Sequence, residues 1–99
     1  MINVAVFMGK IIKDDEFLQN IRYVEICQDY HQNDGKIKKD LIPVMNWNKL
    51  NKGELFTFSE GSLLLIKGRL EYYNGKFVVV CESLSYLGKE QIWKLLKSF

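Results

Sequence analysis

Residue types that build reactive or cross-linked sites are scarce in this sequence. Its 99 residues include one histidine, one proline and two cysteines, and Lys plus Arg outnumber Asp plus Glu only 14 to 12. Cys27 and Cys81 each stand alone in an apolar run, so we interpret them as small buried side chains rather than as a disulfide or metal ligands. We therefore expect no cofactor and no metal centre.

The motifs of catalysis are also missing. His31, the one histidine, falls in a polar stretch, and no Ser/His/Asp, Cys/His or metal-ligand spacing occurs. No glycine-rich phosphate loop of the P-loop form is present. We predict a binding protein without enzymatic activity.

No apolar run approaches the ~20 residues that a membrane-spanning helix needs. The sequence begins with a strand pattern and has no basic leader or cleavage site, so we expect no signal peptide and a cytoplasmic location. A chain of this length forms one domain, and 47% hydrophobic residues suffice for one small core. Self-association would help so short a chain to bury surface.

What is present is a series of strand patterns. Alternation and turn signals predict strands over 2–13, 20–30, 41–50, 62–73 and 76–86. A short helix or irregular plug is expected between 48 and 61. The turn that contains Asp14, Asp15 and Glu16 is expected to be solvated, and Gly9 and Gly68 within strands indicate tight curvature.

Asn74-Gly75 is the signal of a two-residue type I′ hairpin turn, which fixes the register of the last two strands. In that register Tyr72 faces Phe77 and Lys67 faces Glu82. One face of the hairpin is then predicted to be internal and the other external. The residues expected inside include Ile66, Gly68, Leu70, Tyr72, Phe77, Val79 and Cys81, and those expected outside include Lys67, Arg69, Glu71, Tyr73, Val78, Val80 and Glu82.

Five strands with a helical piece between the third and fourth follow the order of an OB-fold, a small Greek-key barrel that binds oligonucleotides or sugars. We therefore predict an all-β, five-stranded OB-fold domain over residues 1–87. Residues 88–99 are predicted to form a C-terminal amphipathic helix, with an apolar stripe of Ile92, Leu95, Leu96 and Phe99.

Over about residues 2–88 the sequence resembles the bacterial single-stranded DNA-binding protein family. The resemblance rests on Val-Phe-Met-Gly-Lys-Ile at 6–11, Asp-Leu-Ile-Pro-Val-Met-Asn-Trp-Asn-Lys-Leu at 40–50, Glu-Gly-Ser-Leu-Leu-Leu-Ile-Lys-Gly-Arg-Leu at 60–70 and Glu-Ser-Leu-Ser-Tyr-Leu at 82–87. It implies that Trp47 is a base-stacking aromatic on the third strand, that Tyr30 is a second one, and that Lys49 is a basic contact. Leu41 falls where some members carry a tryptophan.

Two departures from the family pattern concern its extensions. The hairpin loop that is often long in the family is only Asn74-Gly75 here, which implies a smaller footprint. The chain ends in Lys-Leu-Leu-Lys-Ser-Phe and not in an acidic tip. The sequence is more similar to a short accessory, plasmid or phage member, or to a primosome component, than to the housekeeping type.

The resulting hypothesis is sequence-nonspecific binding of single-stranded DNA in replication, recombination or repair. Bases would stack on aromatic rings while cations follow the phosphates. The candidate contacts are Tyr30, Lys36, Lys38, Lys39, Trp47, Lys49, Lys67, Arg69, Tyr72 and Tyr73.

Two alternatives remain open. The chain could be a protein-interaction subunit of a replication or primosome complex, docked through residues 88–99, or it could bind single-stranded RNA on the same surface. The apolar pattern of residues 2–13 on both faces, and the resemblance, also predict a homo-oligomer, either a dimer or a tetramer.

Overall fold

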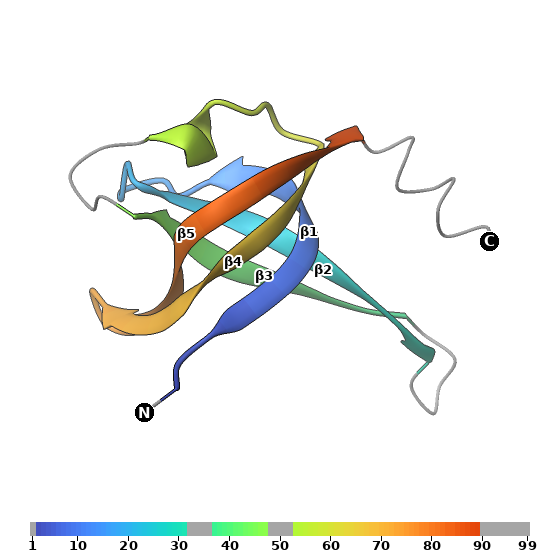
Figure 1. Cartoon of the computed structure of the whole chain (residues 1–99), viewed down its shortest axis with the longest axis horizontal. Coiled ribbons are helices and arrows are strands. Elements are labelled where there is room, and N and C mark those ends of the chain that lie inside the picture. Colours follow the sequence, from blue (N-terminus) through green and yellow to red (C-terminus); the bar gives the residue numbers. More distant parts are fainter. Residues whose placement is uncertain (1, 32–36, 48–52, 90–99) are drawn as a thin grey trace.

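In this computed structural model the chain forms a closed barrel of five strands, which confirms the predicted fold class (Figure 1). The structure describes residues 2–31, 37–47 and 53–89, and for 27–31 and 37–38 it describes the backbone alone. The elements are β1 (Ala5–Asp14), β2 (Ile21–His31), β3 (Ile37–Asn46), the 3-10 turn η1 (Glu54–Phe56), β4 (Ser62–Tyr73) and β5 (Lys76–Lys89).

Around the barrel the strands follow the order β1-β2-β3-β5-β4, and β4 pairs with β1 to close it. The β3–β5 pair is parallel and the other pairs are antiparallel. Pro43 pairs with Tyr23 of β2, and the ladder with β5 begins one residue later, at Val44. The missing N–H of Pro43 therefore falls beside the start of a ladder, one of the positions where proline is tolerated.

Several element boundaries differ from the sequence prediction, and β1 begins at Ala5 instead of residue 2. β3 begins at Ile37 and ends at Asn46, so Trp47 lies in the bend that follows the strand. The helix expected before β4 is a single 3-10 turn. β5 runs through Lys89, so Gly88 and Lys89 belong to a strand; residues 90–99 of the predicted C-terminal helix lie outside the described residues.

The barrel interior is filled by branched aliphatic side chains from all five strands and from η1. Leu55 of η1 is fully buried and closes one end. The close approach expected at the strand glycines is present: an added Cβ on Gly68 would lie 2.0 Å from the carbonyl oxygen of Val80, and one on Gly9 would lie 2.4 Å from Cγ1 of Val24. The buried cluster consists of Ile11, Val24, Val44, Leu55, Leu64, Ile66, Val79 and Cys81.

A second buried cluster lies on the outer face, by which we mean the side of the sheet that points away from the barrel interior. This face carries Tyr23 and Pro43 on β2 and β3, Val80 on β5 and Arg69 on β4, since these residues pair across the ladders. Leu18, from the turn after β1, and Tyr73, near the hairpin tip, pack over the cluster. Its fully or almost fully buried members are Ile21, Met45, Val78 and Val80.

The predicted hairpin register is confirmed from Tyr73–Lys76 to Gly68–Cys81, but a bulge follows at Lys67/Gly68. Lys67 therefore faces Ser83 and not Glu82, so the predicted pair with Glu82 is wrong. An extra residue in one strand shifts every later pairing by one.

The predicted burial of the hairpin tip is also wrong. Tyr72 and Phe77, expected inside, are 63% and 61% exposed, whereas Val78 and Val80, expected outside, are buried. The β1 ladder reaches β4 only as far as Ala5 opposite Gly68, so β1 does not cover the inner side of the tip. On the outer side, Val78 and Val80 are buried because they pack with Ile21 and Met45 in the second cluster.

One buried arginine ties the segment around η1 to the barrel. Arg22 of β2 is 5% exposed, and its Nε donates to Oδ1 of Asp14 at 2.6 Å. Its Nη1 donates to the carbonyl oxygens of Leu55 and Phe58. A buried guanidinium is stable only with such partners, and here it satisfies a carboxylate and two backbone acceptors.

Candidate nucleic-acid interface

Trp47 presents an aromatic surface to solvent on the outer face. Its side chain is 58% exposed, and the guanidinium carbon of Arg69 lies 4.7 Å from the centre of the indole ring. A guanidinium at this distance makes a cation–π contact. The pair therefore offers a planar aromatic group and a planar cation on one surface.

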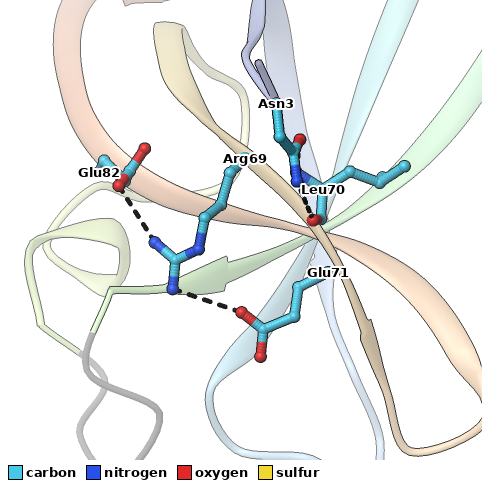
Figure 2. Close-up of polar contacts among 5 residues, drawn as sticks. All are labelled: Asn3, Arg69, Leu70, Glu71 and Glu82. Atoms are coloured by element: carbon cyan, nitrogen blue, oxygen red, sulfur yellow. Dashed lines mark hydrogen bonds and ion pairs between the residues drawn. The ribbon is translucent and has the colours of Figure 1, made fainter. Parts of the chain in front are cut away.

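Arg69 is held in place from both sides. Figure 2 shows its guanidinium between two carboxylates: Nη1 donates to Glu82 at 3.0 Å and Nη2 to Glu71 at 3.3 Å. On the neighbouring residue the side-chain amide of Asn3 exchanges two hydrogen bonds with the backbone of Leu70, at 2.8 and 2.9 Å. The Asn3 amide thus extends the contact between the N-terminal segment and β4 beyond the last ladder pair.

The hollow beside Trp47 is acidic. It has a volume of about 220 Å³, and the carboxylates of Glu54 and Glu82 line it together with Asn46 and Cys81. Burial, followed by the two carboxylates, raises the pKa of the Cys81 thiol to about 11. Cys81 is free, buried and protonated at neutral pH, as expected of a small core side chain; the Cys27 side chain lies outside the described part. A phosphate would be repelled here, so Trp47 is suited to contact a base.

The turn after β1 is joined to the β4–β5 hairpin by a three-residue network. The hydroxyl of Tyr23 donates to Oδ1 of Asp15 at 2.7 Å and accepts from Nζ of Lys76 at 2.7 Å. Lys76 also donates to Oδ1 of Asp15 at 3.3 Å. The expectation of a solvated turn is wrong for Asp15, because the chain folds back over β2 and gives its carboxylate fixed donors.

These donors set the protonation of the network. The backbone N–H of Leu18, then the hydroxyl of Tyr23, hold the pKa of Asp15 far below its ordinary value. The hydroxyl of Tyr23 and the Asp15 carboxylate raise the pKa of Lys76. Both groups are charged at neutral pH, and the network is an ion pair bridged by a phenol.

Replacing Asp15 by asparagine is expected to lower the free energy of unfolding by about 1–3 kcal/mol at about pH 7, because the donors lose a charged acceptor. A carboxyl whose folded pKa is depressed contributes its full stabilisation above its unfolded pKa of about 3.9, and this contribution declines below that value and is lost as the pH falls through the lower folded pKa. Urea unfolding at about pH 7 and about pH 3 should show a deficit that shrinks in acid. A deficit of the same size at both pH values would contradict this role.

The ten candidate contacts are distributed unevenly. Trp47 and Arg69 are brought together, and Lys39 is exposed in β3 on the same side of the strand as Met45. Lys67 is exposed on β4. The side chains of Tyr30 and Lys38, and Lys36 and Lys49 as a whole, lie outside what the structure describes.

Tyr72 and Tyr73 point to opposite sides of the hairpin, as successive strand residues do. Tyr73 is partly buried over the second cluster. Tyr72 is exposed and meets Phe77 edge to face, with ring centres 5.2 Å apart. The structure therefore does not bring Tyr72 to the outer face with Trp47.

The sequence analysis missed Tyr23 as a candidate. Its ring is partly exposed on β2, with the ammonium of Lys13 5.5 Å from the ring centre. The signal was present, because Tyr23 alternates with the buried Val24 and shares a face with Pro43.

Among the described residues, no group of three or more His, Cys, Asp or Glu is placed to hold a metal ion. In the same residues no helix is long and apolar enough to span a membrane.

No protein-family model matches the sequence, and no curated protein matches it. Solved structures match the fold. A small single-stranded DNA-binding protein from Mycoplasma pneumoniae is 16% identical, with a TM-score of 0.59 over 86% of this chain and 93% of that one.

Two yeast structures are similar as well. The mitochondrial single-stranded DNA-binding protein Rim1 of S. cerevisiae is 14% identical, with a TM-score of 0.56 over 90% of this chain and 98% of that one. The Stn1-Ten1 complex of S. pombe contains a chain that is 13% identical, with a TM-score of 0.58 over 98% of this chain and 68% of that one. The strand order of the barrel and these likenesses together establish that the chain has the OB-fold.

Proposed function

We propose that this chain is a cytoplasmic, non-enzymatic protein that binds single-stranded DNA without sequence preference, in replication, recombination or repair. The observation that carries the proposal is the exposed indole of Trp47 beside the fixed guanidinium of Arg69 on the outer face of an OB-fold barrel. Two of the similar structures are named as single-stranded DNA-binding proteins, which supports the same reading.

Base stacking is the main contribution in this mechanism. Every base has a π face, so stacking on an aromatic ring tolerates any sequence and contributes ~1–3 kcal/mol per base. Arg69 covers part of one indole face, so a base stacks on the remaining indole surface or on the guanidinium plane. Glu71 and Glu82 already neutralise Arg69, so its role is to offer a flat surface rather than to bind phosphate.

In this proposal lysine side chains neutralise the phosphates. Lys39 is exposed in β3, and the proposal retains Lys36, Lys38 and Lys49 as its companions. Each phosphate contact on a single strand changes the slope of log affinity against log salt by ~−0.7. Two to four such contacts would give a slope between about −1.4 and −2.8.

The test is a fluorescence-anisotropy titration of labelled oligo-dT and of a matched duplex over a series of salt concentrations. The proposal expects binding of the single strand, weakened by salt with that slope, and much weaker binding of the duplex. Equal affinity for both, or no binding of either, would refute it. A matched RNA oligomer in the same series tests the RNA alternative.

A protein-docking role has its own supporting observation. Leu70, Tyr72 and Phe77 are 48%, 63% and 61% exposed on the side of the hairpin that faces away from Trp47. A Tyr72→Ser variant separates the roles: it should bind oligo-dT like the parent if this patch contacts protein.

We also propose self-association through β1. Val4 and Val6 are 58% and 61% exposed, and Leu65 of β4, paired with Met8 of β1, is 41% exposed. Sedimentation should show a dimer or tetramer that a Val6→Asp variant dissociates, whereas a monomeric parent would refute this.

A further inference from the structure

A second hollow opens on the outer face, away from Trp47. Its volume is about 340 Å³, within the ~300–1,000 Å³ that is usual for small-ligand sites and near the lower limit. Tyr23 pairs with Pro43, four residues before Trp47 in the chain, so the backbone positions of Tyr23 and Trp47 are offset by ~13 Å along the direction of β3. The hollow is lined by Lys13, Asp14, Asp15, Glu16, Phe17, Tyr23 and Leu41.

We propose that this hollow is a second base-binding site, in which an unpaired nucleobase stacks on Tyr23 against Phe17. The inference rests on the proposed function and extends it, since it assigns a second contact to the same strand of DNA. A bound strand would then reach from Trp47 to Tyr23, which fits the lower part of the ~4–16 nucleotides that one OB-fold covers.

The Tyr23 ring is held rigid from its polar end. Its hydroxyl is bonded to Asp15 and Lys76, both at 2.7 Å. Nζ of Lys76 lies 2.7 Å from the hydroxyl oxygen but 5.1 Å from the ring centre, so Lys76 sits beyond the hydroxyl and not over a face. A ring fixed at its edge offers a stacking surface at little cost in side-chain entropy.

Phe17 and Leu41 are the apolar members of the lining beside Tyr23. Phe17 is 87% exposed in the turn after β1, and Leu41 is 46% exposed on β3. The turn is anchored next to Phe17, because the backbone N–H groups of Phe17 and Leu18 both donate to Asp15, at 3.0 and 2.8 Å. The anchored turn thus presents a large aromatic side chain, open to solvent, at the rim of the hollow.

The charges of the hollow favour a base over a phosphate. Asp15 is bonded to Tyr23 and Lys76, and Asp14 accepts from Arg22 at 2.6 Å. Lys13 and Glu16 add one exposed group of each sign. A phosphate would meet three carboxylates here, whereas a neutral base with donors and acceptors on its edge can pair with either sign.

The test compares Tyr23→Leu, Tyr23→Phe and Phe17→Ser with the parent in oligo-dT titrations. We expect Tyr23→Leu to weaken binding by about 5- to 150-fold, the range for one lost stacking contact, because the ring is gone. Tyr23→Phe keeps the ring and should remain within about 3-fold of the parent. Phe17→Ser should also weaken binding, and because Phe17 is exposed, this variant decides the matter if Tyr23→Leu fails to fold.

Phe77→Ser is the matched control for loss of an exposed phenylalanine outside the hollow, on the side of the hairpin that faces away from Trp47. Parental affinity in Tyr23→Leu and Phe17→Ser, with weakened binding in Trp47→Ala, would overturn the second site and leave the proposed function intact. A parent that does not bind oligo-dT would instead overturn the proposed function, and the second site with it.

Discussion

Replacing Trp47 by alanine is expected to weaken oligo-dT binding by about 5- to 150-fold, which corresponds to the ~1–3 kcal/mol of one stacked base. The indole is 58% exposed and lies past the end of β3, so its removal takes little from either buried cluster. The thermal unfolding midpoint should therefore remain close to that of the parent. Isothermal titration of both proteins with the same oligomer measures the difference.

Trp47→Phe is the matched control, because a smaller ring keeps part of the stacking surface. We expect its affinity to fall between those of the parent and Trp47→Ala. If Trp47→Ala binds as tightly as the parent, Trp47 is not the stacking platform and the interface is elsewhere.

Replacing Arg22 by methionine is expected to have the largest effect on stability, a loss of ~2–5 kcal/mol in the free energy of unfolding. Methionine fills a similar volume but leaves the carbonyls of Leu55 and Phe58 without their donor. It also removes the cation that pairs with Asp14 and lies 5.2 Å from the ring centre of Phe56. The segment around η1, which closes one end of the barrel, would lose its main polar anchor.

Urea unfolding and differential scanning calorimetry measure this loss, and for a domain of this size the melting temperature should fall by at least ~8 °C. Lys67→Met is the matched control, since Lys67 is an exposed cation on a strand and its loss should change little. Arg22→Met melting within about 2 °C of the parent would show that the buried guanidinium is not what holds this segment.

The strands and their pairing could be predicted from local signals. Asn74-Gly75 predicted the β4–β5 register correctly from Tyr73–Lys76 to Gly68–Cys81, because a two-residue turn sets the pairing of the strands that it joins up to the first bulge. Whether Tyr72 and Val80 are buried could not be predicted from such local signals. Which side of a long hairpin is covered depends on where β1 ends, at Ala5 opposite Gly68, and that is a property of the whole barrel.

The candidate site could be predicted only in part. Trp47 was singled out by the motif around it and is exposed in the structure. The partner of Arg69 depended on the bulge at Lys67/Gly68, which moves Glu82 next to the guanidinium. Tyr23 was overlooked although its alternation with Val24 was visible in the sequence; the contacts of its hydroxyl with Asp15 and Lys76, which are 61 residues apart, could be known only from the fold.

The most direct test of the account is a tryptophan-fluorescence titration with oligo-dT in a Trp93→Phe variant, where Trp47 is the remaining tryptophan. The account predicts saturable quenching of the indole emission that added salt reverses, since a base stacked on the ring quenches it and the phosphate contacts are ionic. Emission that stays unchanged up to saturating oligomer would contradict the claim that single-stranded DNA binds across the outer face at Trp47.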